Sequence, residues 1–132
     1  MTVIIHVFGL GLIGRGAGRL TGGKFEHRHP TTTFVAILGA TTLLATSLHA
    51  LEAGIWGVAY LQVGALADPR SAMLYSLNAI TSYGHDNIFL EDHWRLMGAM
   101  EALNGWLLFG LSTAFLFSMI EKVGALGKQK NL

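Results

Sequence analysis

The stretch DPRSAMLYSLNAITSYGHDNIF, residues 68–89, decides the fold that we predict for this chain. Asp68 is a typical N-cap residue, Pro69 suits the first helical position, and apolar residues follow at helical spacing. A polar turn that contains a glycine then ends the helix. The pattern predicts a short capped helix over residues 69–81, followed by an irregular loop over residues 82–86.

Long apolar segments flank this stretch on both sides. Residues 32–61 and 94–120 are each long enough to cross about 30 Å of hydrocarbon. Only 13% of the residues are charged, about half the share in a soluble domain. We therefore expect an all-α membrane protein with two transmembrane helices. Irregular backbone at membrane depth must be buried in protein or line water, so the short helix and its loop are predicted to be re-entrant.

The rest of the chain is expected to be accessory to this pore domain, which takes residues 30–122. Residues 1–29 are interpreted as a cytoplasmic segment that is interfacial or poorly ordered, because the apolar run is short for a span. A tilted partial span is the alternative. No signal peptide is expected, because no basic region precedes the apolar run. Residues 123–132 form a short basic tail.

Charge placement predicts the orientation in the membrane. The basic residues outside the central region are Arg15, Arg19, Lys24, Arg28, Lys122, Lys128 and Lys130. The positive-inside rule then places both termini in the cytoplasm of a multi-pass protein of the plasma or inner membrane, and an even number of spans agrees. The chain has no cysteine, which excludes disulfides and thiolate sites. It also lacks a basic patch with interleaved aromatics, so no nucleic-acid partner is expected.

The order of span, short helix, polar loop and span resembles the two-transmembrane potassium-channel pore domain of the tetrameric cation channel family. In that family a T-T-V-G-Y-G-D-like run follows the pore helix. Aligned without gaps, the corresponding residues here are Thr81, Ser82, Tyr83, Gly84, His85, Asp86 and Asn87. The Thr/Ser pair and the first glycine are kept in type, and the other positions depart. The resemblance extends over about residues 39–120.

This resemblance implies a homotetramer in a lipid bilayer that conducts cations passively, and it implies neither an enzyme nor a cofactor. Potassium or other monovalent cations would bind the backbone carbonyls of Ser82, Tyr83 and Gly84, which replace the water shell of the ion. Asn78 and Asn87 would support the filter from behind, where they could hydrogen-bond to each other.

The resemblance also assigns residues in the second span. Gly105 and Gly110 fall at bend positions, and Thr113 and the neighbouring Ala114 face the inner cavity. A gating bend and a close helix crossing are both open interpretations of the two glycines.

The main departure from the family is Asp86, which occupies a position where the family has glycine. Its carboxylate would form a ring of four negative charges at the outer mouth of a tetramer. Such a ring attracts cations generally. We therefore expect a cation pore in which strict potassium selectivity is not retained. The alternative interpretation of His85 and Asp86 is an ordinary extracellular loop.

Besides Arg95 at the start of the second span, two acids and one histidine lie inside the expected spans. His49 and Glu52 are three residues apart and share one helix face, and Glu101 lies in the second span. The acids either handle ions or protons or are buried hydrogen-bond partners, for example of His49 or Asn104. His49 could bind haem or a metal only with further ligands, because the second span contains no histidine. Trp56 and Tyr60 are assigned to an aromatic belt.

Two other functions remain open from the sequence. The chain could be a small haem-binding redox or membrane-anchor subunit that uses His49 and a histidine of a partner. It could also be a protein that kept the pore fold without conducting ions.

Overall fold

The computed structural model describes residues 1–20, 30–84 and 87–128. The described elements are all helical, and this part of the chain contains no strand. The helices are α1 (Thr2–Leu20), α3 (Pro30–Gln62), α4 (Pro69–Ile80), η1 (Asp92–Trp94, a 3-10 turn) and α5 (Arg95–Lys128). α1, α3 and α5 are long and apolar enough to cross a membrane.

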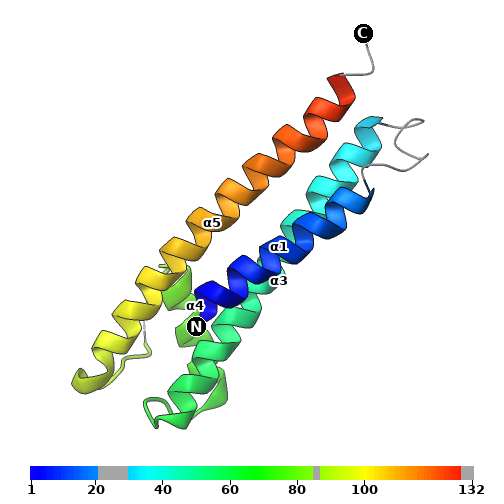
Figure 1. Cartoon of the computed structure of the whole chain (residues 1–132). Coiled ribbons are helices and arrows are strands. Elements are labelled where there is room, and N and C mark those ends of the chain that lie inside the picture. The colour runs from blue at the N-terminus through cyan, green and yellow to red at the C-terminus, as the bar shows by residue number, and fades with distance from the viewer. Residues whose placement is uncertain (21–29, 85–86, 129–132) are drawn as a thin grey trace.

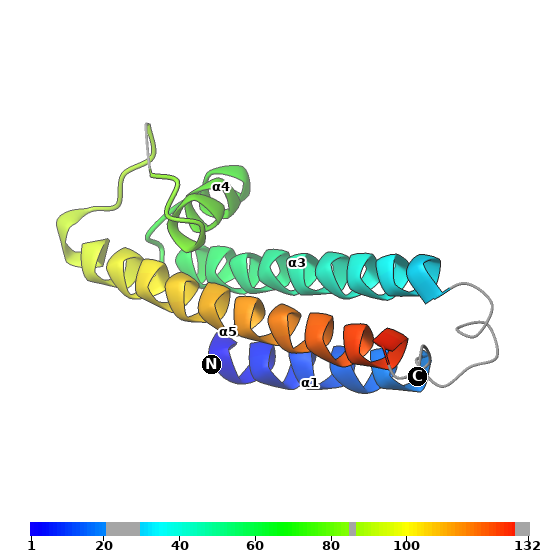
Figure 2. The ribbon, with the colours of Figure 1, turned by 90° about the horizontal axis from the view of Figure 1, so that it is seen from above.

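The three long helices lie side by side (Figure 1). α3 and α5 are antiparallel, and α1 runs in the same direction as α5 while it packs against both. The short α4 packs against α3 and α5 near the end where α3 finishes and α5 begins. Figure 2 shows α4 on one side of this helix pair and α1 on the other.

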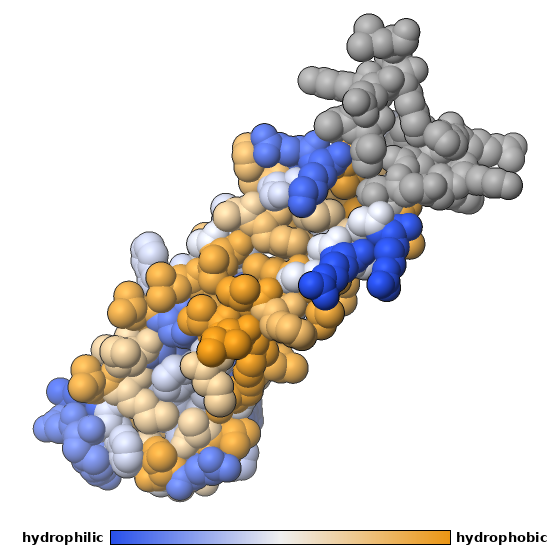
Figure 3. All heavy atoms as spheres, viewed as in Figure 1, coloured by the Kyte–Doolittle hydropathy of each residue, from blue (hydrophilic) through white to orange (hydrophobic). Residues whose placement is uncertain are grey.

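The outer surface is largely apolar. Figure 3 shows apolar residues along the middle of the bundle and hydrophilic residues gathered toward its two ends. Large side chains such as Phe8, Leu43, Trp106 and Phe109 are about 70% exposed. An apolar patch of this extent is unusual on a soluble monomer. The surface is therefore compatible with a membrane protein, as the composition predicts.

The expected cap of α4 is confirmed. The side chain of Asp68 accepts a hydrogen bond from the backbone N–H of Ser71 at 2.8 Å, and Pro69 occupies the first turn. The Ser71 hydroxyl donates a second bond to the same carboxylate at 2.8 Å. These bonds favour the ionised form, so they hold the pKa of Asp68 below its ordinary value.

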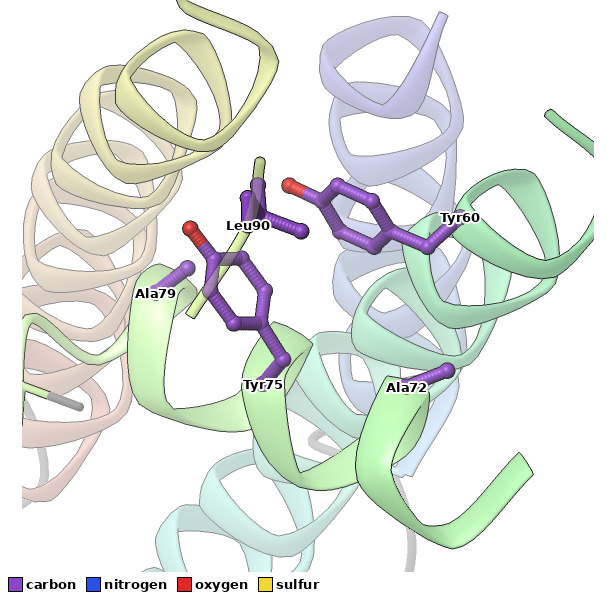
Figure 4. Close-up of a cluster of buried hydrophobic side chains, with 5 residues drawn as sticks. All are labelled: Tyr60, Ala72, Tyr75, Ala79 and Leu90. Carbon is purple, nitrogen blue, oxygen red and sulfur yellow. The ribbon is translucent and has the colours of Figure 1, made fainter. Parts of the chain in front are cut away.

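The apolar core near α4 is built around two tyrosines. Tyr60 of α3 and Tyr75 of α4 meet edge to face with their ring centroids 5.1 Å apart, and Ala72, Ala79 and Leu90 surround them (Figure 4). Tyr60 is fully buried. Its assignment to an aromatic belt is therefore wrong, because its ring fills the contact between α3 and α4. Trp56 also packs against this cluster, and its indole N–H is buried without a hydrogen-bond partner among the residues that the structure describes.

The expectation of a poorly ordered first segment is wrong for Thr2–Leu20, and residues 21–29 lie outside the described residues. Thr2–Leu20 is one continuous helix that runs along α3, and it is neither poorly ordered nor laid across the bundle end. Its glycines allow this close packing, because a Cβ at Gly9 would lie 2.6 Å from Leu48 and one at Gly14 would lie 3.3 Å from Phe115. The tilted span that we gave as the alternative agrees better with this helix.

Candidate functional site

The loop that follows α4 contains the predicted filter residues. Thr81 is the C-cap of α4, and its hydroxyl donates to the carbonyl of Leu77 at 2.6 Å. The backbone N–H of Tyr83 donates to the carbonyl of Asn78 at 3.0 Å. These bonds occupy carbonyls of the last helical turn, which otherwise lack partners. The loop therefore begins from a fixed position at the end of α4.

The backbone of the loop alternates in handedness. Ser82 has a φ of 55° and Gly84 a φ of 100°, whereas the residue between them is not in the left-handed region. Such alternation can turn successive peptide groups toward the same side of the chain. The Ser82 hydroxyl accepts a hydrogen bond from the indole N–H of Trp106 in α5 at 2.8 Å, which ties the loop to that helix.

The remaining predicted filter residues are more exposed or lie outside the described part of the chain. Tyr83 is 80% exposed. His85 and Asp86 lie outside the described residues. Asn87 is exposed, and within the described residues no hydrogen bond joins it to Asn78. The predicted contact between these two amides is therefore not formed in the single chain.

The two glycines assigned to bends have different surroundings. Gly105 faces the backbone of Ile80, and a Cβ there would overlap the Ile80 carbonyl group. Gly110 has open space around it. α5 continues as a helix through both. The close-crossing interpretation therefore fits Gly105. The hydroxyl of Thr113 donates a hydrogen bond to the Phe109 carbonyl of its own helix, at 2.9 Å.

A groove of about 430 Å³ connects the loop to the middle of α3. Its walls include Thr46 and His49 from α3, Thr81 and Ser82 from the loop, and Trp106 and Phe109 from α5. The structure thus brings Ser82 and His49, which are far apart in the sequence, to the same groove.

Glu101 forms the first of two buried polar clusters. It is fully buried and accepts a hydrogen bond from the Tyr60 hydroxyl at 2.7 Å. It also contacts the hydroxyl of Ser76, which donates to the Ala53 carbonyl at 2.7 Å. The three side chains come from α3, α4 and α5, so the cluster fixes α4 between the long helices. This agrees with the interpretation of Glu101 as a buried hydrogen-bond partner behind the loop.

The second cluster lies where α1, α3 and α5 meet. His6 Nδ1 is 2.9 Å from Glu52 Oε1 and 3.1 Å from Oε2, and both side chains are fully buried. His49 Nδ1 is 3.7 Å from Glu52 Oε2. The Ser112 hydroxyl is 2.9 Å from His6 Nε2 and 3.0 Å from His49 Nε2. Asn104, which we named as a possible partner of an acid, instead donates to the Thr2 hydroxyl at 2.9 Å.

The sequence interpretation missed His6 and Ser112. A signal for His6 was present, because Thr2, His6 and Leu10 recur every four residues on the buried face of α1. An ionisable residue on such a face is expected to meet a partner. No role is predicted for His6 from the sequence, because its segment is expected to be interfacial or poorly ordered.

The second cluster does not suit a haem. A haem iron held by two histidines has them on opposite faces of a wide, flat macrocycle. Here the His6 and His49 rings have centroids 4.8 Å apart, and Glu52 and Ser112 occupy the space beside both rings. No room for a macrocycle remains between them.

Comparisons of the chain with protein-family models, with curated proteins and with solved structures found no match.

Proposed function

We propose that the chain is a subunit of a homotetrameric membrane pore that conducts cations passively. The observation that carries this proposal is the position of α4. It is a capped short helix packed against two span-length helices near one end of the bundle, and its carboxyl end leads into a loop of alternating backbone handedness.

The electrostatics of α4 support a cation as the permeant species. The carboxyl end of a helix carries a partial negative charge. α4 has no basic residue in its last turn to offset this charge. Four such ends directed at one axis would stabilise a cation without any acidic side chain.

The exposed surface beside the loop supports assembly. One chain cannot enclose a pore, and the loop residues Ser82 and Tyr83 are exposed together with Trp106 and Phe109. In a ring of four, these residues would face the axis or the neighbouring subunit.

The basic residues of the described helices favour one orientation of the bundle in the membrane. The basic residues Arg15, Arg19 and Lys122 belong to the end of the bundle where α1 and α5 finish, and we assign this end to the cytoplasm. The amino end of α1 points toward α4 instead. With three span-length helices, the argument from an even number of spans no longer applies, and we assign only the carboxyl terminus to the cytoplasm.

Ion flux into liposomes tests the proposal. We expect purified protein to carry a cation current that Ser82→Ala and Asp86→Asn reduce or change in selectivity, because both residues belong to the proposed filter. Reversal potentials in sodium and potassium gradients should show weak discrimination between the two ions. A strongly potassium-selective current would contradict the expectation for selectivity alone.

Matched variants control for the two changes. Ser47→Ala alters an exposed hydroxyl on α3 that bonds only to the Leu43 carbonyl at 2.9 Å. Asp92→Asn alters an exposed acid paired with Arg95 at 3.0 Å. Neither should affect the current. Flux that is unaffected by the filter variants would show that the pore lies elsewhere, and tetramers without flux would support a non-conducting pore-fold protein.

A further inference from the structure

The cluster of His6, His49, Glu52 and Ser112 has no task in passive conduction, yet it places costly groups inside the bundle. Glu52 and His6 are fully buried. Within the described residues, the ionic partners of Glu52 are His6 and His49 alone, with neither lysine nor arginine beside it. A buried carboxylate without a firm cationic partner is expensive. The arrangement therefore calls for an explanation beyond helix packing.

The positions of the imidazole hydrogens determine which atoms of the cluster can donate and which can only accept a hydrogen bond. In one assignment of the ring hydrogens, the Ser112 oxygen accepts from both imidazoles, and each Nε2 then carries a hydrogen. In these neutral tautomers each Nδ1 has a free lone pair. Both Nδ1 atoms then lie beside Glu52, whose carboxylate also only accepts. In this assignment three acceptors face one another, so either a proton or a cation must lie among them.

We propose that His6, His49 and Glu52 bind a divalent transition metal ion of the zinc class. The ligands would be the Nδ1 atoms of both histidines and the Glu52 carboxylate. The ion would satisfy the three acceptors at once, and Ser112 would accept the hydrogen bonds from the opposite ring nitrogens. Such outer hydrogen bonds typically fix the tautomer and the orientation of metal-binding histidines.

The geometry is close to that of a bound ion. The candidate ligand atoms of the three residues lie within 4.8 Å of one another. Ligands at zinc distances in a tetrahedron are separated by roughly 3.4 Å. Two of the separations already approach this value, at 2.9 Å for His6 to Glu52 and 3.7 Å for His49 to Glu52. A modest rotation of the His49 ring, whose side chain is 26% exposed, would close the site.

The groove provides access to the ion. His49 lines the groove that also reaches Ser82, so a metal ion or a water molecule can approach from this side. Two imidazoles and one carboxylate leave a fourth position open, as in zinc sites that bind a water. The site would join α1 to α3 directly and to α5 through Ser112. Metal binding there does not depend on whether the chain forms the proposed pore.

Cobalt(II) binding to the full-length protein in detergent tests the proposal, because tetrahedral cobalt absorbs visible light strongly. We expect one cobalt per chain, displaced by zinc. His6→Gln and Glu52→Gln should each weaken binding by more than about 100-fold, and Ser112→Ala by about 10- to 100-fold, as for other outer partners. His93→Gln, which changes an exposed imidazole 3.6 Å from Glu91, should leave binding unchanged.

A ligand exchange keeps the test decisive if a variant folds poorly. His6→Cys should retain cobalt binding and add a sulfur-to-cobalt charge-transfer band, because a thiolate replaces the imidazole. Zinc should also raise the Tm of the wild type and leave that of Glu52→Gln unchanged. The proposal is overturned if the wild type binds no tetrahedral cobalt, if His93→Gln abolishes binding, or if His6→Cys binds cobalt without the new band.

Discussion

Glu101 is surrounded by the hydroxyl groups of Tyr60 and Ser76. The hydrogens that these groups can donate indicate whether the site needs a carboxylate or only a hydrogen-bond partner. The Ser76 hydroxyl has one hydrogen but contacts two oxygen atoms, the Ala53 carbonyl and the Glu101 carboxyl. If this hydrogen goes to Ala53, a hydrogen on the Glu101 side chain must complete the second contact. A glutamine at this position supplies such a hydrogen from its amide and still accepts from Tyr60.

Glu101→Gln should therefore change the free energy of unfolding by less than about 1 kcal/mol. Glu101→Leu should lower it by roughly 1–3 kcal/mol, because it leaves the buried Tyr60 hydroxyl without its acceptor. Denaturation in mixed micelles measures both values. Equal losses for the two variants would show that the cluster needs a carboxylate and not merely a hydrogen-bond partner.

The burial of single residues could be predicted from the sequence better than the identity of their partners. Glu52 and Glu101 could be expected to have buried partners, because an acid inside an apolar helix is otherwise too costly. The identity of the partners could not be predicted. Tyrosine is a residue type common at membrane interfaces, so the sequence alone does not show that Tyr60 is buried. The partner of His6, Glu52, lies 46 residues away and is reached only when α3 packs against α1.

At the scale of the element, the contact between α4 and α5 depends on one glycine. Gly105→Ala should lower the free energy of unfolding by about 1–3 kcal/mol and reduce flux, because the new methyl group pushes against the backbone of Ile80. Gly110→Ala is the matched control in open space, and it should be neutral or slightly stabilising. If the two substitutions behave alike, the close crossing does not limit stability.

The cap of α4 should make stability depend on pH. The pKa of Asp68 is lower in the folded protein than in the unfolded chain, because the Ser71 hydrogen bonds stabilise the carboxylate. The resulting stabilisation is complete above the unfolded pKa, and it is lost as the pH falls through the lower folded pKa. Asp68→Asn also caps the helix but does not titrate. Thermal unfolding at several pH values should show a steeper acid loss in the wild type.

The helices differ in how well local sequence predicts them. α4 was predicted with its cap and its end within one residue, because Asp68 and Pro69 encode its start locally. α1 was predicted only as the alternative of a tilted partial span, because its apolar run is short for a full span. Its helix is stabilised by contacts of Gly9 with Leu48 and of Gly14 with Phe115, and neither contact is visible in the segment alone.

At the scale of the whole molecule, fourfold assembly predicts a characteristic pair of distances. The chain has no cysteine, so a spin label at Asn87→Cys would be unique in each subunit. Pulsed electron resonance should give two distances in a ratio of about 1.4, the diagonal and the side of a square. Leu43→Cys, on the exposed side of α3, should give the same ratio at longer distances. A single distance would indicate a dimer instead.

The lengths of α3 and α5 have a consequence for the surrounding lipid. With 33 and 34 residues, each helix is about 50 Å long, whereas the hydrocarbon layer is about 30 Å thick. In a bilayer of this thickness, such a bundle would tilt steeply or extend beyond the headgroups on the side of Arg19 and Lys122. Lipids with longer or shorter acyl chains would then change the tilt of the helices. The conformation of the membrane-embedded bundle would therefore respond to the thickness of the bilayer.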